Sequence, residues 1–215
     1  MTLCNWSIAI VVWNGGVAAA QAPSSAAETA PPHYDAAVSR DRQIELALSA
    51  APPAVAANAA VYVLARNGYE KVRDGSNGFS CMVERELVTT MEPQCFDAEG
   101  SRTTLLARLH VEELRAQGKS EAEIARAIRD GYRAGRFRAP TKPGIVYMLS
   151  DENWVFDPSS QKIIHFPGHL MFYAPFMTAQ DLGYETEATL PYLVRPGAPD
   201  ALMIVVPYQA RTRSP

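Results

Sequence analysis

The feature that most limits the fold of this chain is a helical segment that separates two strand-rich segments. Residues 103–117 carry leucines at helical spacing, and Gly118 follows where helices commonly end. The next segment starts with a capping box at residues 120–123, Ser-Glu-Ala-Glu, whose serine hydroxyl and second glutamate each satisfy a free backbone N–H. Behind the box, apolar residues repeat every four positions: Ile124, Ile128 and Tyr132. This spacing predicts a second helix with one buried face.

Short apolar, β-branched or aromatic runs lie on both sides of these helices and predict strands. Four of them precede the helices, at residues 60–64, 69–73, 79–83 and 93–96. Five follow, at residues 144–149, 154–157, 161–166, 170–173 and 201–206. Asp-Gly and Asn-Gly within residues 74–78 predict a hairpin between the second and third runs. Strands at both ends favour α+β over alternating βαβ units. We therefore predict antiparallel strands at both ends of the domain, with the two central helices packed against them.

The length and composition fit one full-sized domain with extensions. The chain has 215 residues, of which 47% are hydrophobic and 20% charged. This composition excludes a wholly disordered chain, a collagen-like fibre and a polytopic membrane protein. We predict a single α+β domain at residues 39–207, a disordered Ala/Pro/Ser linker at 21–38 and a flexible tail at 208–215.

The N-terminal segment has the order of a secretory signal peptide. A short apolar run at residues 7–13 is followed by small residues ending at Ala20, which predicts a signal peptide at residues 1–20. Neither this run nor any later one reaches the roughly 18 apolar residues that span a bilayer, so we expect no transmembrane span in the mature protein. The first cation is Arg40, although signal peptides carry positive charge near their start. Either the true start lies upstream, or residues 6–20 form a buried helix of the mature fold. Cleavage would make the protein secreted or periplasmic.

Two cysteines, Cys81 and Cys95, remain after removal of the leader. In an oxidising compartment such a pair is expected to form a disulfide, and we predict this bond. Closing a loop of about 13 residues would stabilise the fold by on the order of 3 kcal/mol. A cytosolic location would instead favour two buried free thiols, and a reactive Cys81 nucleophile is a third alternative.

The sequence contains none of the common catalytic or cofactor-binding motifs. It lacks the GxGxxG and P-loop patterns, HExxH, CxxC and GxSxG. This lowers the expectation of a common enzyme class, and we predict neither a bound metal nor a cofactor. The net charge of −3 gives no overall attraction to nucleic acid, and few base-stacking aromatics lie among the basic residues. We therefore expect no nucleic-acid partner.

Residues 126–142 contain six basic residues and a single acidic residue, Asp130. Three of them lie roughly along one side of the second helix: Arg126, Arg129 and Arg133. They could grip an anionic small molecule, a glycan or a lipid headgroup. The alternative is a solvated helix face that acidic neighbours partly neutralise.

The C-terminal third is rich in aromatic residues, most of which we expect in the core. A minority could line a ligand pocket. We add His169 and Tyr173, at the aromatic strand, to the candidate ligand-binding residues. The leading hypothesis is thus a secreted or periplasmic protein that binds a small or anionic envelope ligand. A purely structural envelope component is another alternative.

Two histidine pairs support a further alternative, a hydrolase that is metal-assisted in one version. His165 and His169 have the spacing of a two-point metal grip. The turn sequence between them would place their rings on opposite faces if the flanking strands paired tightly. His110 could act as a general base with Glu113 as its orienting partner. Alternatively, Glu113 lies at the rim of the apolar stripe, where a carboxylate stays solvated.

Overall fold

The computed structural model describes residues 38–85, 90–157, 160–184 and 191–206. The predicted signal peptide at 1–20, nearly all of the linker at 21–38 and the tail at 208–215 therefore lie outside the described residues. Within the described ranges, no helix is long and apolar enough to cross a membrane.

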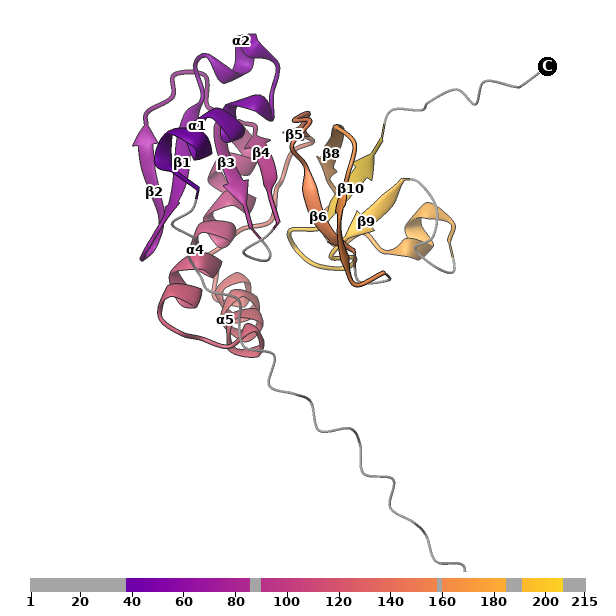
Figure 1. Cartoon of the computed structure of the whole chain (residues 1–215). Helices are drawn as coiled ribbons and strands as arrows, with labels where there is room; N and C mark the ends of the chain where they lie inside the picture. The colour runs from indigo at the N-terminus through magenta and orange to yellow at the C-terminus, as the bar shows by residue number, and fades with distance from the viewer. Residues whose placement is uncertain (1–37, 86–89, 158–159, 185–190, 207–215) are drawn as a thin grey trace, which may run out of the picture.

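An eight-stranded sheet forms the centre of the fold. Its strands are β1 (Ala60–Ala65), β2 (Gly68–Arg73), β3 (Ser80–Glu84), β4 (Glu92–Phe96), β5 (Ile145–Met148), β8 (His169–Tyr173), β9 (Tyr192–Val194) and β10 (Leu202–Val205). They are ordered β2-β1-β3-β4-β5-β8-β10-β9 across the sheet (Figure 1). β6 (Trp154–Asp157) and β7 (Lys162–His165) pair as a two-stranded ribbon. The fold is α+β as predicted, but strands from both ends of the chain join in one sheet, in which β1 and β3 run parallel.

The prediction that residues 69–73 and 79–83 form a hairpin is wrong. β2 pairs with β1, and β3 lies on the other side of β1. The turn-rich residues 74–78 cross the end of β1, where the Ser76 N–H donates to the Asn58 carbonyl (2.8 Å) and the Asn77 side chain donates to the Val55 carbonyl (2.8 Å). The chain does reverse direction between β2 and β3, but β1 is inserted between them.

Five α-helices and one 3-10 helix accompany the strands in the described part of the chain. They are α1 (Arg40–Ser49), α2 (Pro53–Ala56), α3 (Ala98–Arg102), α4 (Thr104–Ala116), α5 (Glu121–Arg133) and η1 (Ala179–Leu182). α1 packs on β1, β3 and β4, whereas α4 packs on β2 and on α5 (Figure 1). The capping box predicted for α5 is present, with Ser120 and Glu123 bonded to each other's backbone N–H.

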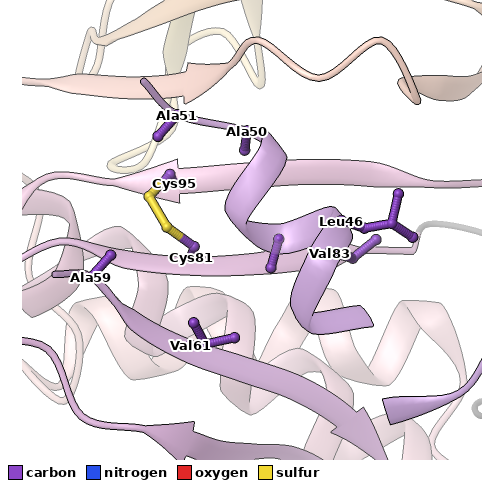
Figure 2. Close-up of a cluster of buried hydrophobic side chains, with 9 residues drawn as sticks. Leu46, Ala50, Ala51, Ala59, Val61, Cys81, Val83 and Cys95 are labelled. Atoms are coloured by element: carbon purple, nitrogen blue, oxygen red, sulfur yellow. A yellow bond between two sulfur atoms is a disulfide. The ribbon is translucent and has the colours of Figure 1, made fainter. Parts of the chain in front are cut away.

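One hydrophobic core lies between α1 and the strands β1, β3 and β4 (Figure 2). Side chains along a strand alternate between the two faces of a sheet. Cys81, Val83 and Cys95 therefore point to the α1 side, where Leu46 is buried with them. Cys81 and Cys95 are direct partners across β3 and β4 and form the predicted disulfide.

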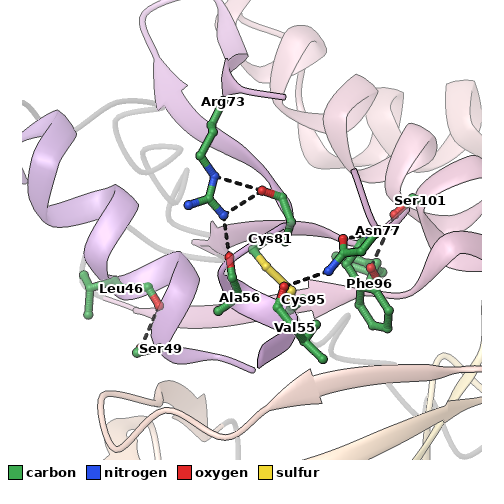
Figure 3. The surroundings of a disulfide bond; sticks show 12 residues. Leu46, Ser49, Val55, Ala56, Arg73, Asn77, Cys81, Cys95, Phe96 and Ser101 are labelled. Atoms are coloured by element: carbon green, nitrogen blue, oxygen red, sulfur yellow. Dashed lines mark hydrogen bonds between the residues drawn. A yellow bond between two sulfur atoms is a disulfide. The ribbon is translucent and has the colours of Figure 1, made fainter. Parts of the chain in front are cut away.

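The surroundings of the disulfide tie the ends of β1 and β2 to α2 (Figure 3). The Arg73 guanidinium donates to the carbonyl oxygens of Ala56 (2.5 Å) and Ala59 (2.6 Å). These bonds use backbone carbonyls at the end of α2 and before β1. The two cysteines themselves are fully buried.

A second core lies on the opposite face of the same sheet. It contains Met82 of β3, Phe96 of β4 and Leu105 of α4, together with apolar residues of β5, β8 and β10. Its edge is fixed by Tyr173, whose hydroxyl donates to Asp97 Oδ1 (2.9 Å). The same oxygen accepts from the Gly100 N–H (2.9 Å) and so caps α3. This face carries the candidate site.

Candidate functional site: a cavity beside α4 and α5

A cavity of about 1450 Å³ lies on the face of the sheet that α1 does not cover. Its floor uses every second residue of several strands: Glu84, Glu92, Gln94, Met148, His169, Met171, Tyr192, Val194, Leu202 and Ile204. The two-residue period of β-strands explains why residues so far apart in the sequence share this surface. α4 and α5 supply one wall, and Phe176 with the loop at residues 195–200 supplies another part of the rim.

Aromatic rings form one region of the cavity lining. The Phe166 ring stands perpendicular to the His169 ring, with their centroids 4.9 Å apart, and also to the Tyr192 ring at 6.5 Å. Phe176 lies at the rim with 60% of its surface exposed. Such a surface suits the apolar body of a small ligand, because ligand pockets combine apolar walls with few polar groups.

Two ion pairs form a charged region of the lining. Arg108 Nη1 of α4 donates to Glu84 Oε1 of β3, and both side chains are largely buried. Arg195 Nε lies 3.2 Å from Asp200 Oδ2, and Arg195 Nη2 donates to the Asp200 carbonyl (3.1 Å). The second oxygen of Glu84 accepts from Gln94 Nε2 (2.7 Å). The guanidinium groups of the largely buried Arg108 and the half-buried Arg195 are thus each matched by a carboxylate, which offsets the cost of removing their charges from water.

The pKa values of these groups show that the two ion pairs act on each other. Burial lowers the pKa of Arg195, and the nearby positive charge of Arg108 lowers it further. Burial also opposes the charge of Arg108, but Glu84 and Asp200 outweigh this effect and leave its pKa raised. Burial, with Asp200 adding to it, raises the pKa of Tyr132 on α5. The Tyr132 hydroxyl therefore stays protonated and can donate a hydrogen bond.

Several buried polar atoms of the cavity lining have no hydrogen-bond partner among the described residues. They include Arg108 Nε, Tyr132 Oη, Gln94 Oε1 and His169 Nε2. His169 is 2% exposed, and burial lowers its pKa, which favours the neutral ring. Its Nδ1 lies 2.9 Å from the Pro167 carbonyl, so Nδ1 carries the proton and Nε2 is an acceptor. Unmet buried groups cost about 1–3 kcal/mol each, and a ligand could satisfy them.

The residues predicted from the sequence are only partly gathered here. Arg129, Arg133 and His169 line the cavity. Arg126 is exposed on α5 outside the lining, and the hydroxyl of Tyr173 is engaged by Asp97. Arg133 Nη1 lies 3.7 Å from Asp130 Oδ1, so a neighbouring acid partly neutralises this side of the helix.

Sequence reasoning missed the charged centre of the cavity. Arg108 and Glu84 lie on α4 and β3, and Arg195 and Asp200 flank a loop of Pro, Gly and Ala. One available signal was a cation at position 108, between the buried Leu105 and the half-buried Leu109 of the α4 stripe. Nothing near Arg195 in the sequence marks it.

Of the two histidine pairs of the hydrolase alternative, His110 and Glu113 lie together, whereas His165 and His169 do not. His165 is exposed on β7, where its Nε2 lies 2.8 Å from the Asp151 carbonyl and its ring contacts Trp154. His169 is buried on β8 in the other sheet. His110 Nδ1 lies 2.7 Å from Glu113 Oε2, and the Glu113 side chain is 52% exposed, at the rim. In the ranges that the structure describes, no three His, Cys, Asp or Glu residues are grouped to hold a metal ion.

The sequence matches no protein-family model, and neither a curated protein nor a solved structure is significantly similar to it. The cavity and its lining are therefore the features from which a function can be inferred.

Proposed function

We propose that this protein is an exported binding protein that holds a small, anionic ligand in the cavity beside α4 and α5. One observation carries the proposal: a cavity of about 1450 Å³ combines apolar walls with buried polar atoms that have no hydrogen-bond partner in the part of the chain that the structure describes. Its volume exceeds the roughly 300–1,000 Å³ of common ligand pockets, so it has room for an elongated molecule.

The charge of the lining supports an anion. Six arginines line the cavity against four acidic residues: Arg108, Arg115, Arg129, Arg133, Arg138 and Arg195 against Glu84, Glu92, Glu121 and Asp200. Arg129 and Arg133 are exposed on α5, and there they attract an anion toward the mouth of the cavity. The disulfide and the predicted leader support an oxidising compartment outside the cytosol.

A thermal-shift panel of anions, glycans and lipids tests the proposal. We expect at least one anionic compound to raise the melting temperature, because a ligand that binds only the folded state stabilises it. The double variant Arg129→Glu/Arg133→Glu should weaken this response. The matched control is Arg126→Glu, which reverses one charge on the same helix but outside the lining. If no compound raised the melting temperature, the proposed function would be wrong.

A further inference from the structure

The cavity has a charged end and an apolar end. The charged end is formed by the ion pairs Arg108–Glu84 and Arg195–Asp200. Asp200 also raises the pKa of Arg108 and of Tyr132, which lines the cavity from α5. The apolar end is formed by the Phe166 ring and the rings of His169 and Tyr192 that pack against it. A ligand that fills the cavity must be amphipathic.

The charged end offers hydrogen-bond donors to an acceptor-rich group. Arg108 binds Glu84 through Nη1, which leaves the guanidinium edge formed by Nε and Nη2 outside that bond. On this edge, Nε is buried without a hydrogen-bond partner in the described structure. The protonated hydroxyl of Tyr132 on α5 is likewise buried without a partner among the described residues. A carboxylate fits such an edge, because its two oxygens can accept two parallel N–H bonds from one guanidinium.

The balance of charge favours one negative charge on the ligand rather than two. Glu84 and Asp200 already neutralise Arg108 and Arg195. A monoanion can gain from the unpartnered donors and from the arginines at the mouth. A dianion such as phosphate would place a second charge near both carboxylates, where screening by water is weak.

The backbone at the rim is strained at two lining residues. Three described non-glycine residues have positive φ: Gln161, Phe176 (φ 63°) and Arg195 (φ 54°). Phe176 and Arg195 line the cavity, whereas Gln161 does not. Such backbone conformations are unfavourable for residues with a side chain and gather at functional sites. The Phe176 N–H donates to the Ala198 carbonyl (2.9 Å), so the exposed ring is held beside the loop that carries Arg195. The ring can cover an apolar chain that leaves the charged end.

From these observations we infer that the ligand is an amphipathic monocarboxylate with an acyl chain, such as a fatty acid. Its carboxylate binds Arg108 and Tyr132, and its chain lies along the aromatic and aliphatic lining toward Phe166. This inference rests on the proposed function and narrows its ligand class.

Isothermal titration of the disulfide-bonded protein with four probes tests the inference. Decanoate has both the charge and the chain, 1-decanol has the chain alone, and butyrate has the charge with little chain. Inorganic phosphate, with all titrations carried out at a pH above 8, is the dianion. We expect decanoate to bind at least tenfold more tightly than decanol or butyrate, and phosphate to give no measurable binding.

Two tyrosine variants separate a binding role from a structural one. Tyr132→Phe removes a hydroxyl that has no hydrogen-bond partner among the described residues, so the melting temperature should not fall. Decanoate affinity should drop about fivefold or more, and decanol affinity should stay unchanged. Tyr173→Phe is the matched control. It removes a hydroxyl bonded to Asp97 outside the lining, so stability should fall and decanoate affinity should not.

The outcomes distinguish the inference from the proposed function. Equal affinity for decanoate and decanol, or unchanged decanoate affinity in Tyr132→Phe, would overturn the carboxylate inference. The proposed function would survive that result if another anion of the thermal-shift panel bound and the Arg129→Glu/Arg133→Glu variant weakened it. If none of the four probes and no compound of the panel bound, both the carboxylate inference and the proposed function would be wrong.

Discussion

Gly131, in the last turn of α5, has no side chain, and this leaves space for a neighbouring ring in the cavity wall. Helix propensity alone would favour alanine here by about 1 kcal/mol. However, a Cβ at this position would lie 2.5 Å from the Phe137 ring, which is buried in the cavity lining. We expect Gly131→Ala to lower the free energy of unfolding by about 1–3 kcal/mol, measured by urea denaturation. In a Phe137→Leu background, the same change should cost much less. A higher free energy of unfolding for the single variant Gly131→Ala than for the unaltered protein would contradict this packing.

Glu112, on α4, makes stability depend on pH. Burial raises its pKa to about 7, although its ion pair with Arg115 opposes the shift. Glu84 and Glu121 add to the rise. Since the ordinary value is 4.5, the folded protein binds this proton more tightly than the unfolded chain does. The contribution of Glu112 is therefore full below about pH 4.5 and is lost as the pH rises through 7.

Replacement of Glu112 by glutamine should remove this dependence. Between about pH 5 and pH 7.5, we expect the unaltered protein to lose up to about 3 kcal/mol of stability through this group, and Glu112→Gln to lose clearly less. Chemical denaturation at both pH values measures the difference. Glu45→Gln, at a position whose side chain is 68% exposed on α1, is the control and should keep the slope of the unaltered protein. Identical slopes for Glu112→Gln and the unaltered protein would contradict the assignment.

At the scale of elements, the Cys81–Cys95 bond joins directly opposed residues of β3 and β4. The cysteines are 14 positions apart, and a loop of this size predicts about 3 kcal/mol of stabilisation. We expect Cys81→Ala/Cys95→Ala to unfold at a lower urea concentration than the oxidised protein. Reductant should not change the urea midpoint of this variant. Both cysteines are buried, so reductant reaches the disulfide only in molecules that have unfolded. At equilibrium, reductant should therefore lower the urea midpoint of the unaltered protein. Equal midpoints for the variant and the oxidised protein would show that the bond adds no stability.

The elements that could be predicted from the sequence are those whose signals lie within a few residues. The capping box at Ser120 and the stripe behind it correctly predicted α5. The turn residues before β3 correctly predicted a change of direction but not that β1 would insert between β2 and β3. A local turn signal carries no information on which strand becomes the neighbour, because long-range packing decides the order of a sheet.

At the scale of the whole molecule, the same limit explains the partial prediction of the site. Arg129 and Arg133, which line the cavity, could be proposed from the sequence because their charges repeat along one helix. Arg108 and Arg195 were missed because their segments share one cavity only through the sheet order β3-β4-β5-β8-β10-β9 and through the contact of Arg108 on α4 with Glu84 on β3. Charged residues with partners in distant segments look like ordinary surface charges in a sequence.

Export of the whole chain has its own test. The intact mass of natively expressed protein, before and after reduction with alkylation, reports leader cleavage and thiol state together. We expect a chain that starts at Gln21 and takes up alkylating reagent on Cys81 and Cys95 only after reduction. A full-length chain recovered from the cytosol with both thiols free would contradict export.

The central claim is that the cavity beside α4 and α5 is the ligand site, and a crystal structure of the protein grown with decanoate tests it most directly. We predict density for one molecule in the cavity, with a carboxylate oxygen within hydrogen-bond distance of Arg108 Nε and Tyr132 Oη. An unoccupied cavity in crystals that hold decanoate elsewhere on the protein would contradict it.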